Sequence, residues 1–243
     1  MRSSMSVDSR QIIFDTETTG MNKDGGPIYM GHRLIEIGCV EMIERQLTGN
    51  TFHCYINPGM LIDKEAIAVH GITDTFLKDK PYFEDIVKPF LSFIQGAELI
   101  AHNAKFDVSF IDYELQRLGY LKTLKDMCTI TDTLLLAREK KNKGELTGNL
   151  NLDALCKYYG IDNSSRTYHG ALLDAQILAD VYLFLTGGQK KLQFYVDINS
   201  KKIVNQKVSE KQNIKIIYAN ELELRQHHER LALMSEHFWD HDV

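Results

Sequence analysis

The first quarter of the chain consists of apolar runs separated by polar, glycine-rich stretches. Residues 11–18 and 34–43 are rich in isoleucine and other large apolar side chains, as buried strands are, and residues 22–31 between them predict a loop. A third strand pattern covers residues 51–56 and follows the turn-like Leu47-Thr48-Gly49-Asn50. We therefore predict a meander of three strands with antiparallel pairing.

Helical periodicity prevails from residue 83 onward. Apolar side chains recur every three or four positions in residues 83–95, although Pro89 predicts a kink or two shorter pieces. A short buried strand is expected at residues 99–101. Further helices are expected at residues 106–118, 131–140, 152–159 and 171–185. This order of elements predicts an α/β fold, in which a mixed sheet is flanked by helices.

The composition changes at residue 189. Residues 195–212 are rich in lysine, asparagine and glutamine and predict a flexible linker. Residues 213–219 have a strand pattern, and Asn220 is placed to cap a helix that extends to about residue 237. The helix would present a narrow apolar stripe formed by Leu224, Leu231 and Phe238. Such a stripe suits a partner protein, and the alternative is that the segment folds back on the main domain.

Composition and charge narrow the class of protein. The 243 residues are 44% hydrophobic and 25% charged, and no apolar run is long enough to cross a membrane. The start, MRSSMSVDSR, lacks the apolar segment of a secretory signal, so we expect a cytoplasmic protein. The net charge of −5 argues against binding of long nucleic acid through a broad basic surface, although it permits a small acidic pocket.

The cysteines do not form a recognisable metal motif. They are Cys39, Cys54, Cys128 and Cys156, scattered through apolar or mixed patterns without a C-x-x-C pair. We expect reduced thiols in the core, and a zinc site is the less favoured alternative.

Two acidic residues interrupt the first predicted strand. Because side chains alternate along a strand, Ile13, Asp15 and Glu17 should point to one face while Ile12 and Phe14 point to the other. Both carboxylates are thus directed at one place. The alternative is a solvated turn at the end of the strand.

Two further acids stand at predicted helix starts. Asp107 lies in the first turn after His102-Asn103-Ala104, where a carboxylate also interacts favourably with the helix dipole. Asp174 belongs to the apolar stripe of its helix, and residues 171–186 contain no Arg or Lys to neutralise it. A buried carboxylate is costly unless it is paired or bound to metal, so its partner must come from elsewhere.

Convergence of these four acids would require cations between them, because like charges oppose ionisation and folding. Oxygen-rich clusters select Mg²⁺ or Mn²⁺, and two such ions are suited to the cleavage of phosphodiesters. His169, five residues before Asp174, should lie on the preceding loop or first turn, from which it could act as a general base. The alternative for His169 is an exposed side chain without a role.

Three motifs together resemble a known family. They are DTETTG at residues 15–20, HNAKFD at 102–107 and HGALLD at 169–174, and in this order they resemble the DEDDh 3′→5′ exonucleases, whose fold is ribonuclease H-like. The resemblance implies that Asp15, Glu17 and Asp174 bind the metals and contact the substrate. It also implies that Asp107 assists at the second metal and that His169 is the general base.

Further stretches resemble the proofreading subunits of bacterial replicative DNA polymerases. They include residues 31–32, 34–38, 69–72, 152–156 and 169–176, and the similarity covers about residues 10–188. It implies an exonuclease domain over residues 10–188, after a disordered segment of residues 1–9. It also implies that Val69 and His70 line the pocket of the 3′-terminal nucleotide, the alternative being simple packing at a helix end.

The segment after this domain resembles a docking peptide. Residues 189–194, QKKLQF, are similar to the motif by which replication proteins bind the sliding clamp, with Gln189, Leu192 and Phe194 as the matching positions. An ordinary linker is the alternative. The same resemblance implies that residues 213–243 bind the catalytic subunit of the polymerase.

The implied function is proofreading by two-metal hydrolysis of a single-stranded or mispaired DNA 3′ end, with release of nucleoside 5′-monophosphates. Two alternatives stay open. One is an exoribonuclease, because no residue in the sequence must read or reject a 2′-hydroxyl. The other is a scaffold that bridges clamp and polymerase without catalysis, which the complete set of acids disfavours.

Overall fold

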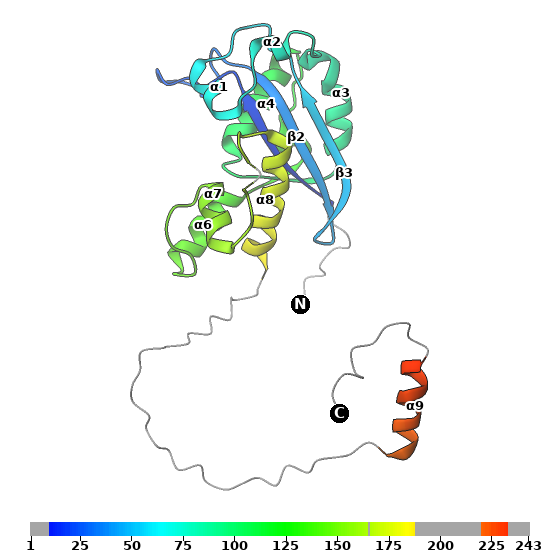
Figure 1. Cartoon of the computed structure of the whole chain (residues 1–243). Coiled ribbons are helices and arrows are strands. Elements are labelled where there is room, and N and C mark those ends of the chain that lie inside the picture. The colour runs from blue at the N-terminus through cyan, green and yellow to red at the C-terminus, as the bar shows by residue number, and fades with distance from the viewer. Residues whose placement is uncertain (1–9, 165, 188–219, 233–243) are drawn as a thin grey trace, which may run out of the picture. The chain divides into compact units, whose positions relative to one another are not determined.

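The computed structural model describes residues 10–164, 166–187 and 220–232, drawn in colour in Figure 1. They fall into two units, residues 1–191 and 192–243, each considered by itself. The predicted segments at residues 1–9, 189–194, 195–212 and 213–219 lie outside the described residues.

The first unit is built on a mixed sheet of five strands in the order β3-β2-β1-β4-β5. The strands are β1 (Gln11–Thr18), β2 (Leu34–Ile43), β3 (Gln46–Tyr55), β4 (Glu98–Ala101) and β5 (Thr129–Asp132). The first three pair antiparallel, whereas β4 pairs parallel with both β1 and β5. The predicted meander and the bounds of its first two strands are confirmed.

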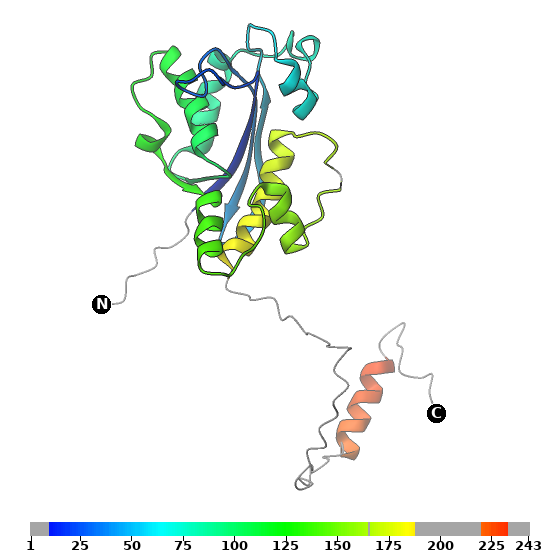
Figure 2. The ribbon, with the colours of Figure 1, turned by 90° about the vertical axis from the view of Figure 1, so that its left-hand side faces the viewer.

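The helices of this unit are α1 (Lys64–His70), α2 (Asp74–Leu77), α3 (Phe83–Ile94), α4 (Lys105–Arg117), α5 (Leu124–Met127), α6 (Thr133–Asn142), α7 (Leu152–Tyr159) and α8 (Ala171–Thr186). Figure 2 shows the sheet between two helical layers. The predicted helix over residues 83–95 is one helix that continues through Pro89. None of the described helices could span a membrane.

The turn between β2 and β3 differs from the prediction. The chain reverses at Glu44 and Arg45, whose φ angles are 50° and 64°, so that Ile43 pairs directly with Gln46. This is the left-handed geometry of a two-residue hairpin. The predicted turn Leu47-Thr48-Gly49-Asn50 lies within β3, and its polar side chains are used there, because Thr48 and Asn50 both donate hydrogen bonds to Glu41.

The short strand β5 and the start of α6 also differ from the prediction, which began a helix at residue 131. Residues 129–132 instead pair with β4, and the side chain of Asp132 accepts a hydrogen bond from the backbone nitrogen of Leu134. Asp132 is therefore the N-cap that delays the helix to Thr133.

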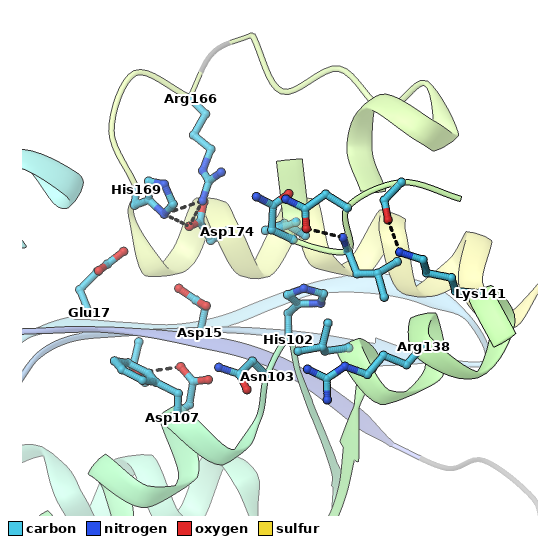
Figure 3. A pocket seen from close by; sticks show the side chains of 18 residues that line it. Asp15, Glu17, His102, Asn103, Asp107, Arg138, Lys141, Arg166, His169 and Asp174 are labelled. Atoms are coloured by element: carbon cyan, nitrogen blue, oxygen red, sulfur yellow. Dashed lines mark hydrogen bonds and ion pairs between the residues drawn. The ribbon is translucent and has the colours of Figure 1, made fainter. Parts of the chain in front are cut away.

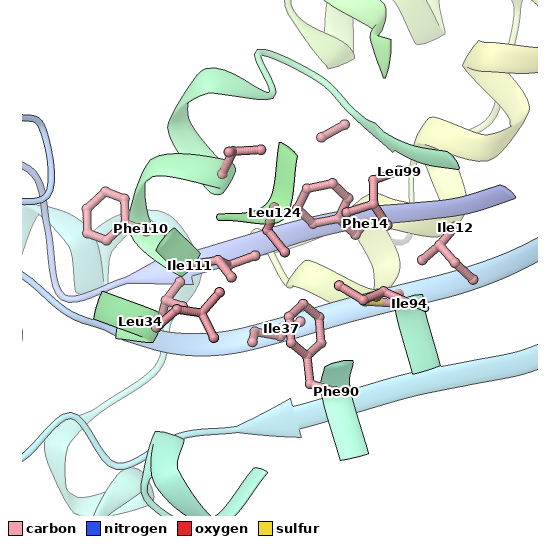
Figure 4. Close-up of a cluster of buried hydrophobic side chains, with 14 of the residues drawn as sticks. Ile12, Phe14, Leu34, Ile37, Phe90, Ile94, Leu99, Phe110, Ile111 and Leu124 are labelled. Carbon is pink, nitrogen blue, oxygen red and sulfur yellow. The ribbon is translucent and has the colours of Figure 1, made fainter. Parts of the chain in front are cut away.

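Alternate residues of β1 enter two separate cores. Ile12 and Phe14 pack with α3 and α4, in the cluster shown in Figure 4. Ile13 packs on the opposite face with residues of α7 and α8. The predicted alternation is confirmed, and it directs the side chains that follow Ile13, those of Asp15 and Glu17, toward the α8 layer.

The second unit contains α9 (Glu221–Ala232). Its start is a capping box, in which Asn220 Oδ1 accepts from the Glu223 nitrogen and Glu223 Oε2 accepts from the Asn220 nitrogen, each at 2.9 Å. The helix exposes the side chains of Leu222 and Leu224. The remainder of the predicted stripe, including Phe238, has no described side chain.

Candidate active site

Four carboxylates from three elements converge above the centre of the sheet. Figure 3 shows Asp15 and Glu17 rising from β1 toward Asp174 in the first turn of α8, with Asp107 approaching from the first turn of α4. All of them line one cavity of about 660 Å³. The convergence predicted from the sequence is thus present.

Burial and mutual repulsion disfavour the charged forms of these acids. Burial, followed by the charges of Asp107, Glu17 and Asp174, raises the pKa of Asp15 well above its ordinary value. Burial and the charge of Asp174 raise the pKa of Glu17 to about 8, and burial raises that of Asp107 to about 7. Full ionisation of the four acids is therefore unfavourable unless a cation lies among them.

Asp107 is held in place by a residue that sequence reasoning missed. Thr16 Oγ1 donates a hydrogen bond of 2.7 Å to Asp107 Oδ1, and the contact is buried. Thr16 lies between Asp15 and Glu17 on β1 and therefore faces the α4 side of the sheet. The strand thus presents two acids on one face and orients a third from the other.

The neutralising partner of Asp174 is Arg166, which the sequence analysis did not single out. Arg166 Nη2 lies 2.5 Å from Asp174 Oδ2, and Arg166 Nη1 lies 2.6 Å from Asp153 Oδ1. Arg166 lies a few residues before α8, just outside residues 171–186, which contain no Arg or Lys. The loop folds back over the first turn of α8. The short distance along the chain between Arg166 and Asp174 could therefore have indicated this ion pair.

His169 lies on this loop, as predicted. Its Nδ1 atom is 3.3 Å from Asp174 Oδ2 and 2.7 Å from Arg166 Nη2, and 44% of its side chain is exposed. The backbone nitrogen of His169 donates to the carbonyl oxygen of Val69 at 3.1 Å, which joins the loop to the end of α1.

Val69 and His70 lie beside the cavity without lining it. Val69 is half exposed, whereas His70 is buried in the last turn of α1, and its Nδ1 accepts from the Ile72 nitrogen at 3.0 Å. Burial lowers the pKa of His70. The backbone contact to His169 joins this pair to the loop beside the acid cluster, and their role at the terminal nucleotide stays a prediction.

The geometry suits a divalent cation. Glu17, His169 and Asp174 each offer a ligand atom, and these atoms lie within 4.8 Å of one another. Asp174 Oδ1 is buried without a hydrogen-bond partner, which is costly unless a cation or donor approaches it. Carboxylate oxygens are the ligands that Mg²⁺ and Mn²⁺ prefer, so the donor set fits such ions.

The cavity extends from the acids to a basic wall that sequence reasoning also missed. Arg138 and Lys141, from α6, line it together with His102 and Asn103. His102 Nδ1 lies 2.8 Å from Thr133 Oγ1, and burial lowers the pKa of His102. The basic residues at positions 138–143 could have indicated this wall, but the sequence did not show which side of their helix faces the acids.

The comparisons with known proteins agree with this geometry. Residues 12–182 match the family described as "Exonuclease" (RNase_T). The DNA polymerase III subunit epsilon of Salmonella typhimurium is 49% identical over 241 residues, with 94% of each chain covered. That of Escherichia coli is 46% identical over 238 residues, again with 94% of each chain covered.

Solved structures support the same fold. A complex of exonuclease X with 5′-overhanging duplex DNA superimposes with a TM-score of 0.53 at 27% identity, covering 74% of this chain and 94% of that chain. The zinc-bound complex of Escherichia coli exonuclease I with single-stranded DNA has a TM-score of 0.61 at 18% identity, covering 72% of this chain and 39% of that chain. The latter likeness concerns the fold alone.

Proposed function

Because the chain belongs to the exonuclease family and to the DNA polymerase III epsilon subunits, which are proofreading 3′→5′ exonucleases, we propose that its four converging carboxylates and His169 hydrolyse the 3′-terminal phosphodiester of DNA. The observation that carries the proposal is the meeting of Asp15, Glu17, Asp107 and Asp174 in one cavity beside His169. The products would be nucleoside 5′-monophosphates. This is the chemistry of the DEDDh subtype.

The family is metal-dependent, and we assign two cations, Mg²⁺ or Mn²⁺, to this site. Asp15, Glu17 and Asp174 would hold them, and Asp107 would assist at the second. When bound, the cations would lower the pKa of the attacking water and stabilise the negative charge on the leaving oxygen. The raised pKa values of Asp15 and Glu17 support this assignment, because burial and mutual repulsion cause them and a bound cation offsets both effects.

His169 acts as the general base in this proposal. An unprotonated ring nitrogen accepts the proton of the attacking water, a role that suits imidazole near neutral pH. The loop position leaves the ring partly exposed and able to approach the reacting phosphate. The backbone contact to Val69 limits where the ring can lie.

The substrate is a short single-stranded or mispaired 3′ end. We assign the terminal nucleotide to the neighbourhood of Val69 and His70, next to His169. Arg138 and Lys141 line the other end of the cavity, where their charge would attract the phosphates that precede the scissile one. A cavity with acids at one end and cations at the other orients a strand without a broad basic surface.

The partners follow from the family and from two segments of the sequence. We propose that residues 10–188 form the exonuclease domain, that Gln189, Leu192 and Phe194 bind the sliding clamp, and that residues 213–243 bind the catalytic subunit of the polymerase. Residues 195–212 would join these parts. A replication protein of this bacterial family works in the cytoplasm. Clamp and polymerase would supply the hold on DNA that a protein of net charge −5 lacks.

The test is digestion of three labelled substrates in Mg²⁺, in Mn²⁺ and in EDTA. The substrates are a single-stranded DNA, a duplex with a mispaired 3′ end and a single-stranded RNA of the same sequence. Stepwise 3′ loss that favours the mispaired DNA, vanishes in EDTA and collapses in His169→Ala supports the proposal. Preference for RNA would indicate an RNA-trimming enzyme, and the absence of metal-dependent digestion would leave a scaffolding role.

A further inference from the structure

Arg166 brings a buried positive charge into the acid cluster. Only 6% of its side chain is exposed, and one of its nitrogens, Nη2, contacts both Asp174 Oδ2 at 2.5 Å and His169 Nδ1 at 2.7 Å. Figure 3 shows the guanidinium reaching down from its loop onto these two side chains. Arg166 therefore occupies a position that attracts cations.

These contacts compete with the proposed chemistry. Asp174 and His169 belong, with Glu17, to the group whose ligand atoms lie within 4.8 Å of one another. A guanidinium has donors only, so its hydrogen bond to His169 uses the lone pair of Nδ1, with which that atom would accept a proton or a metal. A guanidinium and a divalent cation also repel each other at contact distance.

The pairing of Arg166 is incomplete, which makes it displaceable. Arg166 Nε and Asp174 Oδ1 are both buried without a hydrogen-bond partner. Because these atoms are unsatisfied, the cost of desolvating the pair is not fully offset, and a cation that satisfies Asp174 can compete with the arginine. At its other end, Arg166 Nη1 is held at 2.6 Å by Asp153, a carboxylate that is 54% exposed and outside the cluster.

We propose that Arg166 is an internal counter-ion that closes the metal-free site and releases Asp174 and His169 when a divalent cation binds. The contact with Asp153 keeps the released guanidinium at the edge of the cavity, where it faces an incoming phosphate. Arg166 is thus a positioning residue that couples cation binding to the freeing of the base. The inference rests on the proposed metal site and adds a competing occupant to it.

Competition lowers the apparent affinity for metal, because the cation binds only the fraction of molecules in which Arg166 has left. Removal of the guanidinium should therefore tighten Mg²⁺ binding by about tenfold and leave the metal-free protein less stable. Arg166→Lys should behave in between, since an ammonium cannot bridge Asp153, Asp174 and His169 at once.

The experiment uses the full chain and does not depend on nuclease activity. Calorimetric titration gives the Mg²⁺ dissociation constant of the wild type, Arg166→Gln and Arg166→Lys, and thermal unfolding in EDTA gives their metal-free stability. Arg138→Gln is the matched control, because Arg138 lines the same cavity and none of the ion pairs among the described residues joins it to the acids. A crystal structure with Mg²⁺ and thymidine 5′-monophosphate locates the guanidinium.

Tighter Mg²⁺ binding in Arg166→Gln than in Arg138→Gln, with a lower melting temperature in EDTA that Mg²⁺ restores, supports the inference. The Mg²⁺ structure should then place Arg166 Nη2 more than about 4 Å from Asp174 Oδ2, beyond ion-pair distance. Equal or weaker Mg²⁺ binding in Arg166→Gln, or an intact contact in the Mg²⁺ structure, overturns it. Failure of every variant to bind metal would instead contradict the proposed function.

Discussion

A methyl group on Gly38 would lie 2.1 Å from the backbone nitrogen of Leu172, so that only glycine lets α8 lie directly on the sheet at this point. Gly38 is also the residue of β2 that pairs with Asp15 of β1. The close approach of β2 and α8 therefore occurs next to Asp15 on the sheet, and at Leu172 on the helix, two residues before Asp174. The contact between the backbones of β2 and α8 therefore determines how far Asp174, on α8, lies from Asp15, on β1.

Gly38→Ala should lift α8 away from the sheet. The obstructing atoms belong to the backbone, so no side chain can move aside to relieve the clash. Overpacking usually costs roughly 1 to 3 kcal/mol, and we expect Gly38→Ala to lower the free energy of unfolding by about 3 kcal/mol or more. Exonuclease activity should fall together with melting temperature. Gly170→Ala is the control, since nothing lies within 4 Å of a methyl group there. Equal effects of the two changes would contradict this explanation.

Asp15→Asn should abolish activity and preserve the fold. The amide has nearly the same shape, but it is a poorer cation ligand and removes one of the charges that repel one another in the cluster. We expect turnover in Mg²⁺ to fall by at least about a hundredfold, while the melting temperature in EDTA stays level or rises. Digestion of labelled single-stranded DNA and thermal unfolding measure the two effects. Near-normal turnover would contradict the role of Asp15.

The stability of the metal-free protein should fall as pH rises. Burial and neighbouring acids raise the pKa of Glu17 from 4.5 to about 8, so between these values the folded chain keeps a proton that the unfolded chain has released. The free energy of unfolding therefore decreases with pH across this window. Buried His70 and His102 act in the opposite direction at low pH, because burial lowers their pKa.

The contribution of Glu17 is isolated by comparison with Glu17→Gln. In EDTA, the stability of the wild type relative to this variant should decline from about pH 5 to about pH 8 and then level off. Saturating Mg²⁺ should remove most of the decline, because a bound cation favours the ionised form. Denaturant titrations at several pH values test both statements. A difference that does not change with pH would show that Glu17 titrates normally.

The basic wall of the cavity should act on DNA affinity. Arg138→Ala and Lys141→Ala should each raise KM for single-stranded DNA and lower the slope of log KM against log salt by about 0.7, the value for one phosphate contact, with little change in kcat. Lys143→Ala is the matched control, because Lys143 has the same charge in the same segment but does not line the cavity. A similar effect of all three changes on KM would indicate only a general electrostatic attraction between the protein and DNA, and no contact inside the cavity.

The docking peptide should act independently of catalysis. Replacement of Leu192 and Phe194 by alanine removes the two apolar anchors proposed for the clamp groove, and binding to the clamp should weaken by more than tenfold. Digestion of free single-stranded DNA should not change. Calorimetry with purified clamp measures the first effect, and Lys190→Ala, inside the same peptide, is the control. Retained clamp binding would leave residues 189–194 as an ordinary linker.

Local patterns in the sequence determined much of the site. Alternation along residues 11–18 placed Asp15 and Glu17 on one face, and helical periodicity placed Asp174 on a buried stripe, both as the structure has them. These inferences succeed because the period of a strand or helix follows from backbone geometry, which acts over a few neighbouring residues. The elements with a clear period, at residues 11–18, 152–159 and 171–186, were accordingly predicted with correct or nearly correct bounds.

Tertiary contacts decided the rest. The turn at Glu44 and Arg45 has no glycine or asparagine to mark it, and it follows from the register of β2 against β3. Thr16 reaches Asp107 across 91 residues of sequence. Such contacts depend on how separate elements pack, which no local period encodes.

Arg166 illustrates the same division. The sequence by itself established that Asp174 is buried and needs a cation, because an ionised carboxylate on an apolar stripe is costly. Only the folded loop decided which cation it is, since the path of the chain before α8 brings the guanidinium over both Asp174 and His169. The need for a partner is a property of local burial, whereas the identity of the partner is a property of the tertiary structure.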